Sequence, residues 1–249
     1  MAKVKVACFD FASCEGCQIE LTNLGEAAFL GLLEHLEFVE FREAMSEKTR
    51  DPIDIAFIEG SFTRRADRAR LEEIRKRAKT VIAYGSCATI GGINALKNHQ
   101  KDYKAFVYGD KAEMPQLDTA AALPIHEAIQ VDYKVHGCPM SQAEFVRIVS
   151  DLLHGKEPTI PNHPVCVECK LRETVCRYQV GDHCLGLAAR AGCGAPCPAD
   201  GVPCEACRGF VDHPNQAALE RVLRDKGGLP PVRAFTKSRM WTACYRERE

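Results

Sequence analysis

Short apolar segments alternate with amphipathic segments through the first 150 residues of the chain. Runs of apolar and β-branched residues predict strands, and apolar positions repeated every three to four residues predict helices. Strands that alternate with helices predict a parallel sheet with helices on both faces. The expected strands cover residues 4–11, 38–41, 53–60, 80–85 and 131–135, and the expected helices cover 18–36, 66–78 and 142–153.

This pattern ends near residue 155. Pro158, Pro161 and Pro164 punctuate a linker, and residues 166–207 then carry eight cysteines with few apolar residues. Such a segment is poorly able to fold by hydrophobic burial, so bound metal is expected to supply much of its folding energy.

Two further segments have weak patterns. Residues 97–123 lack clear periodicity and predict loops with a short helix, and the mostly polar tail predicts a short helix at 217–223. We therefore expect an α/β domain over residues 1–155 and a loop-rich metal-binding domain over residues 156–249.

Charge and hydropathy narrow the classes of function. The chain has 33 Lys and Arg against 34 Asp and Glu, for a net charge of -1, and both signs are mixed along it. This balance provides no basic surface for a nucleic acid. No window reaches the roughly 18 unbroken apolar residues of a membrane span, and the first residues do not form a secretion signal. We expect a cytoplasmic protein.

Cysteine is the most informative residue type. Fourteen cysteines in 249 residues are a smaller share than the roughly 8–10% typical of disulfide scaffolds, so metal ligation is the better interpretation. Twelve of them make three groups of four, the number of thiolates that a [4Fe-4S] cluster or a structural zinc needs. Cys8 and Cys244 are left over. One group is dispersed, at Cys14, Cys17, Cys87 and Cys138, and eight lie close together, at Cys166, Cys169, Cys176, Cys184, Cys193, Cys197, Cys204 and Cys207.

The dispersed cysteines follow three of the expected strands. Because the carboxyl ends of parallel strands meet at one edge of a sheet, where open α/β sheets bind ligands, these cysteines are expected to converge on one site. Gly16, Gly85 and Gly137 lie beside them and would let backbone N–H groups approach a cluster. The alternative is that Cys87 and Cys138 are small buried apolar residues.

The eight close cysteines also fit two metals. Cys166-x2-Cys169 and Cys204-x2-Cys207 each resemble half of a zinc ribbon, which makes two structural zincs the alternative. Pro198 directly follows a cysteine, as proline follows the last ligand of bacterial ferredoxin runs, and this favours iron.

Six motifs together resemble the small subunit of a nickel-iron hydrogenase. The likeness is strongest to the cytoplasmic multi-subunit branch that includes sulfhydrogenase delta subunits and coenzyme-F420-non-reducing enzymes. The motifs are Cys14-x2-Cys17 after the first strand, Gly85-Ser86-Cys87-Ala88, Gly137-Cys138-Pro139, Pro164-Val165-Cys166-Val167-Glu168-Cys169, Arg190-Ala191-Gly192-Cys193-Gly194-Ala195-x-Cys197-Pro198, and Cys204-x2-Cys207-Arg208-Gly209.

The resemblance implies a flavodoxin-like domain with a proximal cluster, followed by an iron-sulfur domain with medial and distal clusters. Cys166 stands where periplasmic uptake enzymes use a histidine, and Cys197 stands where they carry a proline and hold a [3Fe-4S] centre. A fourth thiolate at each site predicts three [4Fe-4S] clusters. The implied ligands are Cys14, Cys17, Cys87 and Cys138 (proximal), Cys193, Cys197, Cys204 and Cys207 (medial), and Cys166, Cys169, Cys176 and Cys184 (distal).

The resemblance also implies partners and a reaction. The site that oxidises or evolves hydrogen would lie on a separate nickel-iron large subunit, and a further redox subunit, containing flavin or iron-sulfur clusters, would meet the distal end. Glu20, three residues after Cys17, is a candidate proton relay near the subunit interface. The alternative for Glu20 is an exposed carboxylate favoured by the helix dipole.

Two other functions stay open from the sequence. A subunit like the 20 kDa chain of respiratory complex I would share the first domain, but it needs one cluster and leaves eight cysteines unexplained. A zinc-binding interaction module would explain the paired cysteines without redox chemistry.

Overall fold

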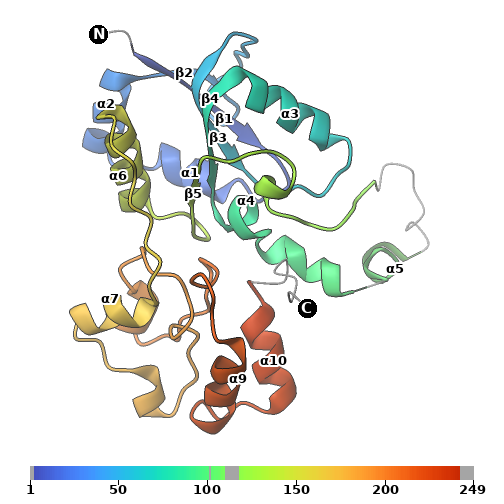
Figure 1. Cartoon of the computed structure of the whole chain (residues 1–249), viewed down its shortest axis with the longest axis vertical. Coiled ribbons are helices and arrows are strands. Elements are labelled where there is room, and N and C mark those ends of the chain that lie inside the picture. The colour runs from blue at the N-terminus through green and yellow to red at the C-terminus, as the bar shows by residue number, and fades with distance from the viewer. Residues whose placement is uncertain (1–2, 101, 110–117, 242–249) are drawn as a thin grey trace.

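A five-stranded parallel sheet forms the first part of the chain, as the apolar pattern predicted. The computed structural model describes residues 3–100, 102–109 and 118–241 (Figure 1). The strand order is β2-β1-β3-β4-β5, and every neighbouring pair is parallel. The strands are β1 (Val4–Asp10), β2 (Leu36–Phe41), β3 (Ile53–Glu59), β4 (Ala78–Tyr84) and β5 (Tyr133–Val135).

Helices cover both faces of this sheet (Figure 1). One face packs against α1 (Gly16–Thr22), α2 (Glu26–His35) and α6 (Gln142–Leu153). The other packs against α3 (Asp67–Arg77) and the start of α4 (Ser86–Ile90), together with the short η3 (Ile125–Glu127). The apolar faces of all these elements are thereby buried, which explains the continuous apolar runs Val6–Phe9, Ile55–Ile58 and Val81–Ala83 in the central strands.

The single helix expected over residues 18–36 is wrong. Two helices, α1 and α2, occupy this stretch, and Leu36 begins β2. Asn23 ends α1 by donating its backbone N–H to Ile19, and Gly25 precedes α2 with extended backbone. Asparagine and glycine are poor helix formers that favour helix ends, and they outweigh an apolar periodicity that continues through Leu24.

The weakly patterned region holds two short helices within its described part. These are η1 (Ile93–His99) and α5 (Tyr103–Tyr108), with extended chain from 118 to 124. Residues 101 and 110–117 of this region lie outside the described residues. No residue of α5 is buried, and Phe106 is 82% exposed. The absence of a buried face explains why the sequence has no clear period here.

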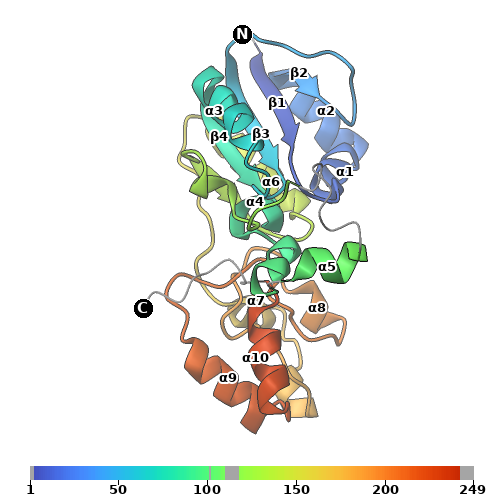
Figure 2. The same ribbon diagram turned by 90° about the vertical axis from the view of Figure 1, so that its right-hand side faces the viewer.

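The cysteine-rich part has more apolar packing than the sequence predicted. Residues 166–207 contribute mainly alanines, but the tail adds larger side chains to the same small core, among them Leu219 and Leu223. The expected tail helix extends to α9 (Gln216–Asp225), and an unexpected second helix, α10, packs beside it (Figure 2). The other elements are α7 (Val165–Leu171), η4 (Arg177–Val180), α8 (Pro196–Ala199) and α10 (Pro231–Arg239).

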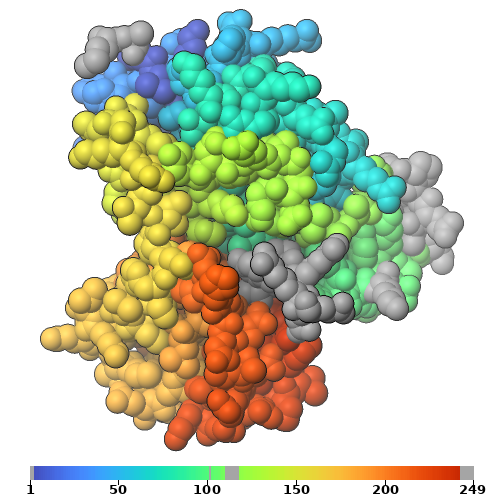
Figure 3. Space-filling model, viewed as in Figure 1, coloured from blue at the N-terminus to red at the C-terminus, as the bar shows by residue number. Residues whose placement is uncertain are grey.

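The cysteine-rich part lies beyond the carboxyl edge of the sheet (Figures 1 and 2). Figure 3 shows the surface hollowed between α6, in yellow, and the chain below it. A pocket of about 530 Å³ lies there, lined by residues such as Arg147, Ile160 and Glu168. Among the described residues, none of the helices has the length and apolar content to cross a bilayer.

Candidate metal centres

The four dispersed cysteines lie together at the carboxyl edge of the sheet. Cys17 starts α1 after β1, Cys87 lies in α4 after β4, and Cys138 follows β5. Burial raises the pKa of Cys87 to about 12, and the neighbouring Cys138 and Cys14 thiols contribute to the rise. Burial likewise raises the pKa of Cys138 to about 11. The structure therefore brings this group together, and the raised pKa values of Cys87 and Cys138 favour the protonated thiols unless a metal replaces the proton.

Glycines pack directly against these sulfurs. A Cβ added to Gly85 would overlap Cys17 Sγ, and a Cβ on Gly92 would lie 2.8 Å from Cys87 Sγ. Both glycines have positive φ, of +82° and +60°, which other residues adopt only at a cost. Cys17 and Cys87 therefore lie against bare backbone, where any other residue would meet their sulfurs.

Glu59 is a buried acid at the centre of this edge that the sequence analysis did not single out. It ends β3, which lies between β1 and β4, and it is 2% exposed. Its carboxylate accepts hydrogen bonds from the backbone N–H groups of Cys17 and Gln18, both at 3.1 Å. Burial raises its pKa. The available signal was a carboxylate at the end of an apolar strand, directly before Gly60.

Two acids near the first cysteine pair, the candidate Glu20 and Glu15, differ in surroundings. Glu20, on α1, accepts a hydrogen bond from Gln142 Nε2 at 2.7 Å, so it joins α1 to α6. Glu15, inside the loop between the two cysteines, has positive φ and a hydrogen bond from Gln18. Burial and the nearby Glu59 raise the pKa of Glu15 to about 7. The proton-relay role of Glu20 stays a prediction.

Four of the remaining thiols gather around α7 and η4. Burial raises the pKa of Cys166 to about 11, and the adjacent thiols of this group add to the effect. Cys184 Sγ accepts a backbone hydrogen bond from Gly186 at 3.4 Å. Backbone donors of this kind stabilise a thiolate and tune any cluster bound to it. The group comprises Cys166, Cys169, Cys176 and Cys184.

The last four thiols surround α8. Cys204 is buried, and its pKa is raised first by burial and then by the charges of Cys184, Cys207 and Cys193, in that order. Glu168 supports the loop around Cys193 by accepting from Gly192 at 2.8 Å and Gly194 at 3.1 Å. Within the described residues, no three His, Cys, Asp or Glu side chains converge closely enough to hold one metal ion. The group comprises Cys193, Cys197, Cys204 and Cys207.

The group around α8 adjoins both of the others. After burial, the charge of Cys207 is the next cause that raises the pKa of Cys138, and the Cys138 backbone forms a hydrogen bond with the Cys207 thiol. Ser86, beside Cys87, donates its hydroxyl to the Cys207 carbonyl. On the other side, the Cys204 backbone donates to Cys184 Sγ at 3.3 Å. The three groups therefore follow one another in a row.

Comparisons with known proteins cover both parts of the chain. Residues 14–152 match the family model described as NADH ubiquinone oxidoreductase, 20 Kd subunit. The chain is 33% identical to sulfhydrogenase 2 subunit delta of Pyrococcus furiosus, over 89% of this chain and 93% of that one. It is 35% identical to a subunit of the vhu F420-non-reducing hydrogenase of Methanocaldococcus jannaschii, with 84% and 83% covered.

A solved structure agrees with these relatives. A chain of an NAD+-reducing [NiFe]-hydrogenase in the H2-reduced state superposes with a TM-score of 0.57 at 28% identity. The match covers 64% of this chain and 96% of that one. The expected resemblance is therefore confirmed, because the relatives span the cysteine-rich part that the 20 Kd family model leaves out. The chain belongs to the small subunits of nickel-iron hydrogenases, of the type found in sulfhydrogenases and F420-non-reducing hydrogenases.

Proposed function

We propose that this electron-transfer subunit binds three [4Fe-4S] clusters and relays single electrons between a nickel-iron large subunit and a further redox subunit. The observation that carries the proposal is the row of three four-thiol groups, in which the middle group adjoins both neighbours. The proposed ligands are Cys14, Cys17, Cys87 and Cys138 (proximal), Cys193, Cys197, Cys204 and Cys207 (medial), and Cys166, Cys169, Cys176 and Cys184 (distal).

The donor set fits iron-sulfur clusters. Each group offers four cysteines, the ligand number that a [4Fe-4S] cluster takes, and Cys166 and Cys197 complete the distal and medial sets. Each cluster, when bound, would accept and release one electron at a time. The chain's own part is to supply the four thiols of each set, to bury them, and to aim backbone N–H groups at them, as at Cys184.

The proposal assigns an end of the row to each partner. The large subunit would dock at the carboxyl edge of the sheet, beside the proximal group, and the further redox subunit at the distal group. The two-domain division at residues 155 and 156 and the proton relay at Glu20 belong to the same proposal. We also propose a cytoplasmic location, because the thirteen described cysteines are free thiols and a reducing compartment keeps thiols available for metal.

The test is metal analysis of the native complex with EPR of its reduced state. We expect roughly twelve irons per chain, since each of three clusters holds four, and nickel in a partner subunit. Roughly four irons would leave only the proximal site and contradict the proposal, and zinc without iron would replace it with a zinc module.

Matched cysteine variants sharpen this test. Cys197→Ser is expected to alter one of the three cluster signals, because it removes the fourth medial thiolate. Cys8→Ala is the control, since Cys8 is buried in β1 at 1% exposure and belongs to none of the groups. Three unchanged signals in Cys197→Ser would refute the medial assignment.

A further inference from the structure

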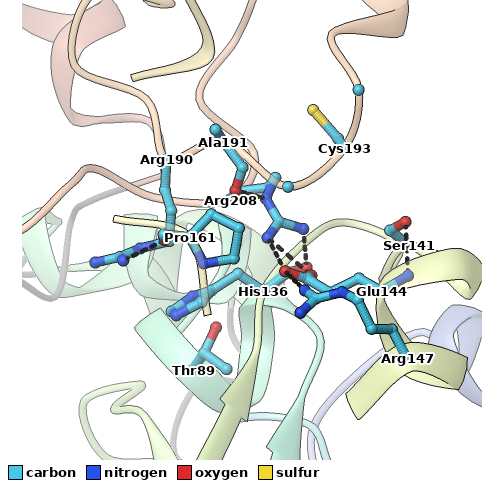
Figure 4. A network of polar contacts seen from close by, with 12 residues as sticks. Thr89, His136, Ser141, Glu144, Arg147, Pro161, Arg190, Ala191, Cys193 and Arg208 are labelled. Carbon is cyan, nitrogen blue, oxygen red and sulfur yellow. Dashed lines mark hydrogen bonds and ion pairs between the residues drawn. The ribbon is translucent and has the colours of Figure 1, made fainter. Parts of the chain in front are cut away.

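One buried guanidinium connects the sheet domain to the cysteine-rich part (Figure 4). Arg208 is 2% exposed. Its Nη1 donates to the carbonyl of His136 at 2.6 Å, and its Nε donates to the carbonyl of Ala191 at 2.9 Å. Its Nη2 donates to both carboxylate oxygens of Glu144, on α6, at 2.9 and 2.8 Å. Arg208 thus joins α6 and two separate loops.

Each loop that Arg208 holds leads to a proposed cluster ligand. Arg208 itself directly follows Cys207, and its two carbonyl partners each lie two residues before another cysteine, Cys138 or Cys193. The same side chain therefore fixes the approach of one proximal ligand and two medial ligands. The hydroxyl of Ser86, which donates to the Cys207 carbonyl, ties the two groups together at a second point.

The chain is built closely around this contact. Gly192 has φ +117°, and a Cβ there would overlap Arg208 Nη2 and lie 2.7 Å from Glu144 Oε1. Any other residue at this position would push the guanidinium away from the carboxylate. The backbone conformation at Gly192 and the ion pair therefore depend on each other.

Stability alone is a weak explanation for such a pair. Removing two charges from water costs several kcal/mol, and well-packed apolar residues often stabilise a fold as much or more. Glu144 is 4% exposed, so its desolvation is nearly complete, and burial raises its pKa. What the pair provides beyond stability is directional bonding, because the planar guanidinium reaches three acceptors along fixed lines.

The guanidinium also places a positive charge beside the medial thiols. Arg208 directly follows Cys207, and its Nε donates to the carbonyl of Ala191, two residues before Cys193. A nearby cation favours a thiolate over a thiol, and for the same reason favours the more negative, reduced state of a bound cluster.

We propose that Arg208, held by Glu144, is a positioning residue that fixes the separation of the proximal and medial ligand sets and so sets the electron-transfer rate between them. The inference rests on the proposed function. In the step concerned, one electron leaves the cofactor of the proximal group and enters that of the medial group, and no bond is made or broken. Electron transfer falls steeply with distance, so a small shift of the Cys207 segment changes the rate.

Arg208→Lys separates geometry from charge. Lysine keeps the positive charge but offers one nitrogen, which cannot reach Glu144, His136 and Ala191 in three directions. The matched control is Arg190→Lys. Arg190 is also buried, at 7% exposure, and lies on the same segment as Ala191, but its guanidinium bonds the carbonyl of Pro161 and the carboxylate of Asp212, neither of which Arg208 contacts.

The experiment uses the purified hydrogenase complex. We would measure three quantities. They are the iron content, the magnetic interaction between proximal and medial clusters in reduced-state EPR, and the rate of medial cluster reduction after rapid mixing with hydrogen. We expect Arg208→Lys to keep its iron, to weaken the magnetic interaction, and to slow medial reduction about tenfold or more, the effect typical of outer-shell substitutions. Arg190→Lys is expected to match the wild type in all three.

A second variant tests the proposal if the Arg208→Lys complex does not assemble. Glu144→Gln combined with Arg208→Gln leaves no unpaired buried charge and keeps hydrogen-bonding groups in place. If Arg208→Lys loses iron, the same losses of magnetic interaction and rate in this double variant support the proposal. Three clusters with wild-type interaction and rate in either variant would overturn it. A wild-type complex with fewer than three clusters would instead refute the proposed function.

Discussion

The sheet edge and the cysteine-rich part bind their thiols on two different kinds of scaffold. The proximal cysteines follow strands whose core is filled by large side chains, including Phe57, Tyr84 and Phe145, all at most 1% exposed and in ring contact with one another. In the smaller core of the cysteine-rich part, five of the twelve buried side chains are alanines, and the larger ones include Phe210, Leu219 and Leu223. Apolar burial can therefore hold the first scaffold, whereas the second depends far more on its metals.

Polar contacts also have different roles in the two parts of the molecule. At the sheet edge, Glu59 orients the start of α1 through two backbone N–H groups. In the cysteine-rich part, loops are held by ion pairs and by carboxylates such as Glu168, which bonds the backbone on both sides of Cys193. Where apolar area is scarce, directional polar contacts carry more of the structure.

Removal of iron is the strongest way to test this contrast. We expect chelation under reducing conditions to leave the sheet folded and to unfold residues 166–207, because structural metals there supply the folding energy. Hydrogen exchange measured by mass spectrometry should keep protection in β1, β3 and β4 and lose it in α7 and α8. Equal loss of protection in both parts would show that the sheet also depends on its cluster.

Paired glycine variants give an intermediate effect. Gly85→Ala and Gly181→Ala both place alanine at positive φ, +82° and +76°, each at about 1–2 kcal/mol of backbone strain. Only Gly85 faces a sulfur, since a Cβ there would overlap Cys17 Sγ while nothing lies within 4 Å at Gly181. We expect Gly85→Ala to lose roughly four irons, one cluster's content.

The matched outcome for Gly181→Ala is full iron content with a slightly lower unfolding temperature. Both variants keep the secondary structure of the sheet, which circular dichroism checks. If Gly85→Ala keeps the wild-type iron content, the α1 segment must move to accommodate the methyl group. The sheet edge would then be less rigid than its packing indicates.

A surface ion pair on the sheet should give the smallest effect. Lys79 Nζ lies 2.6 Å from Asp54 Oδ1, and Lys79 is 75% exposed. The hydrogen bond from Lys79 lowers the pKa of Asp54 below its ordinary value of 3.8. The ion pair therefore stabilises the fold when the pH is above the ordinary pKa of an aspartate. This contribution is lost as the pH falls through the lowered pKa of Asp54.

Lys79→Met should reduce the free energy of unfolding by less than about 1 kcal/mol at pH 7. The difference from wild type should shrink toward zero in urea titrations of the iron-free chain as the pH falls through the lowered pKa of Asp54. Lys76→Met on α3 is the control, an exposed lysine that takes part in none of the salt bridges found among the described residues. A difference that grows at low pH would contradict the assigned pKa direction.

Much of the fold was predictable because its signals are local. The strands 53–60 and 80–85 were found within two residues of their observed bounds, since both are buried and β-branched. The helix over 142–153 was found at its observed bounds, with Ser141 as its cap. The single helix predicted over 18–36 was wrong because the prediction followed the apolar periodicity and gave no weight to the helix-ending residues Asn23 and Gly25. Helix α10 was missed because it buries only a small part of a polar sequence.

The polar residues that organise the sites were less predictable. Glu59 lies 42 residues from Cys17 along the chain, and Glu144 lies 64 residues from Arg208. Neither pairing has a spacing that a sequence period could reveal, because each depends on which strands and loops become neighbours. Arg208 stood inside a recognised motif, yet its position there does not indicate a partner on α6.

The sequence by itself determined the parallel sheet, the position of the first four cysteines at its carboxyl edge, and the membership of a hydrogenase family. The sheet and the cysteine positions follow from the hydrophobic period and the cysteine spacing along the chain, and the family follows from the resemblance of six motifs. Only the tertiary structure decided the contacts of the α8 group with both other thiol groups, the burial of Glu59, and the contact between Arg208 and Glu144. Those features arise from contacts between residues distant in sequence, and they exist only once apolar burial has brought the segments together.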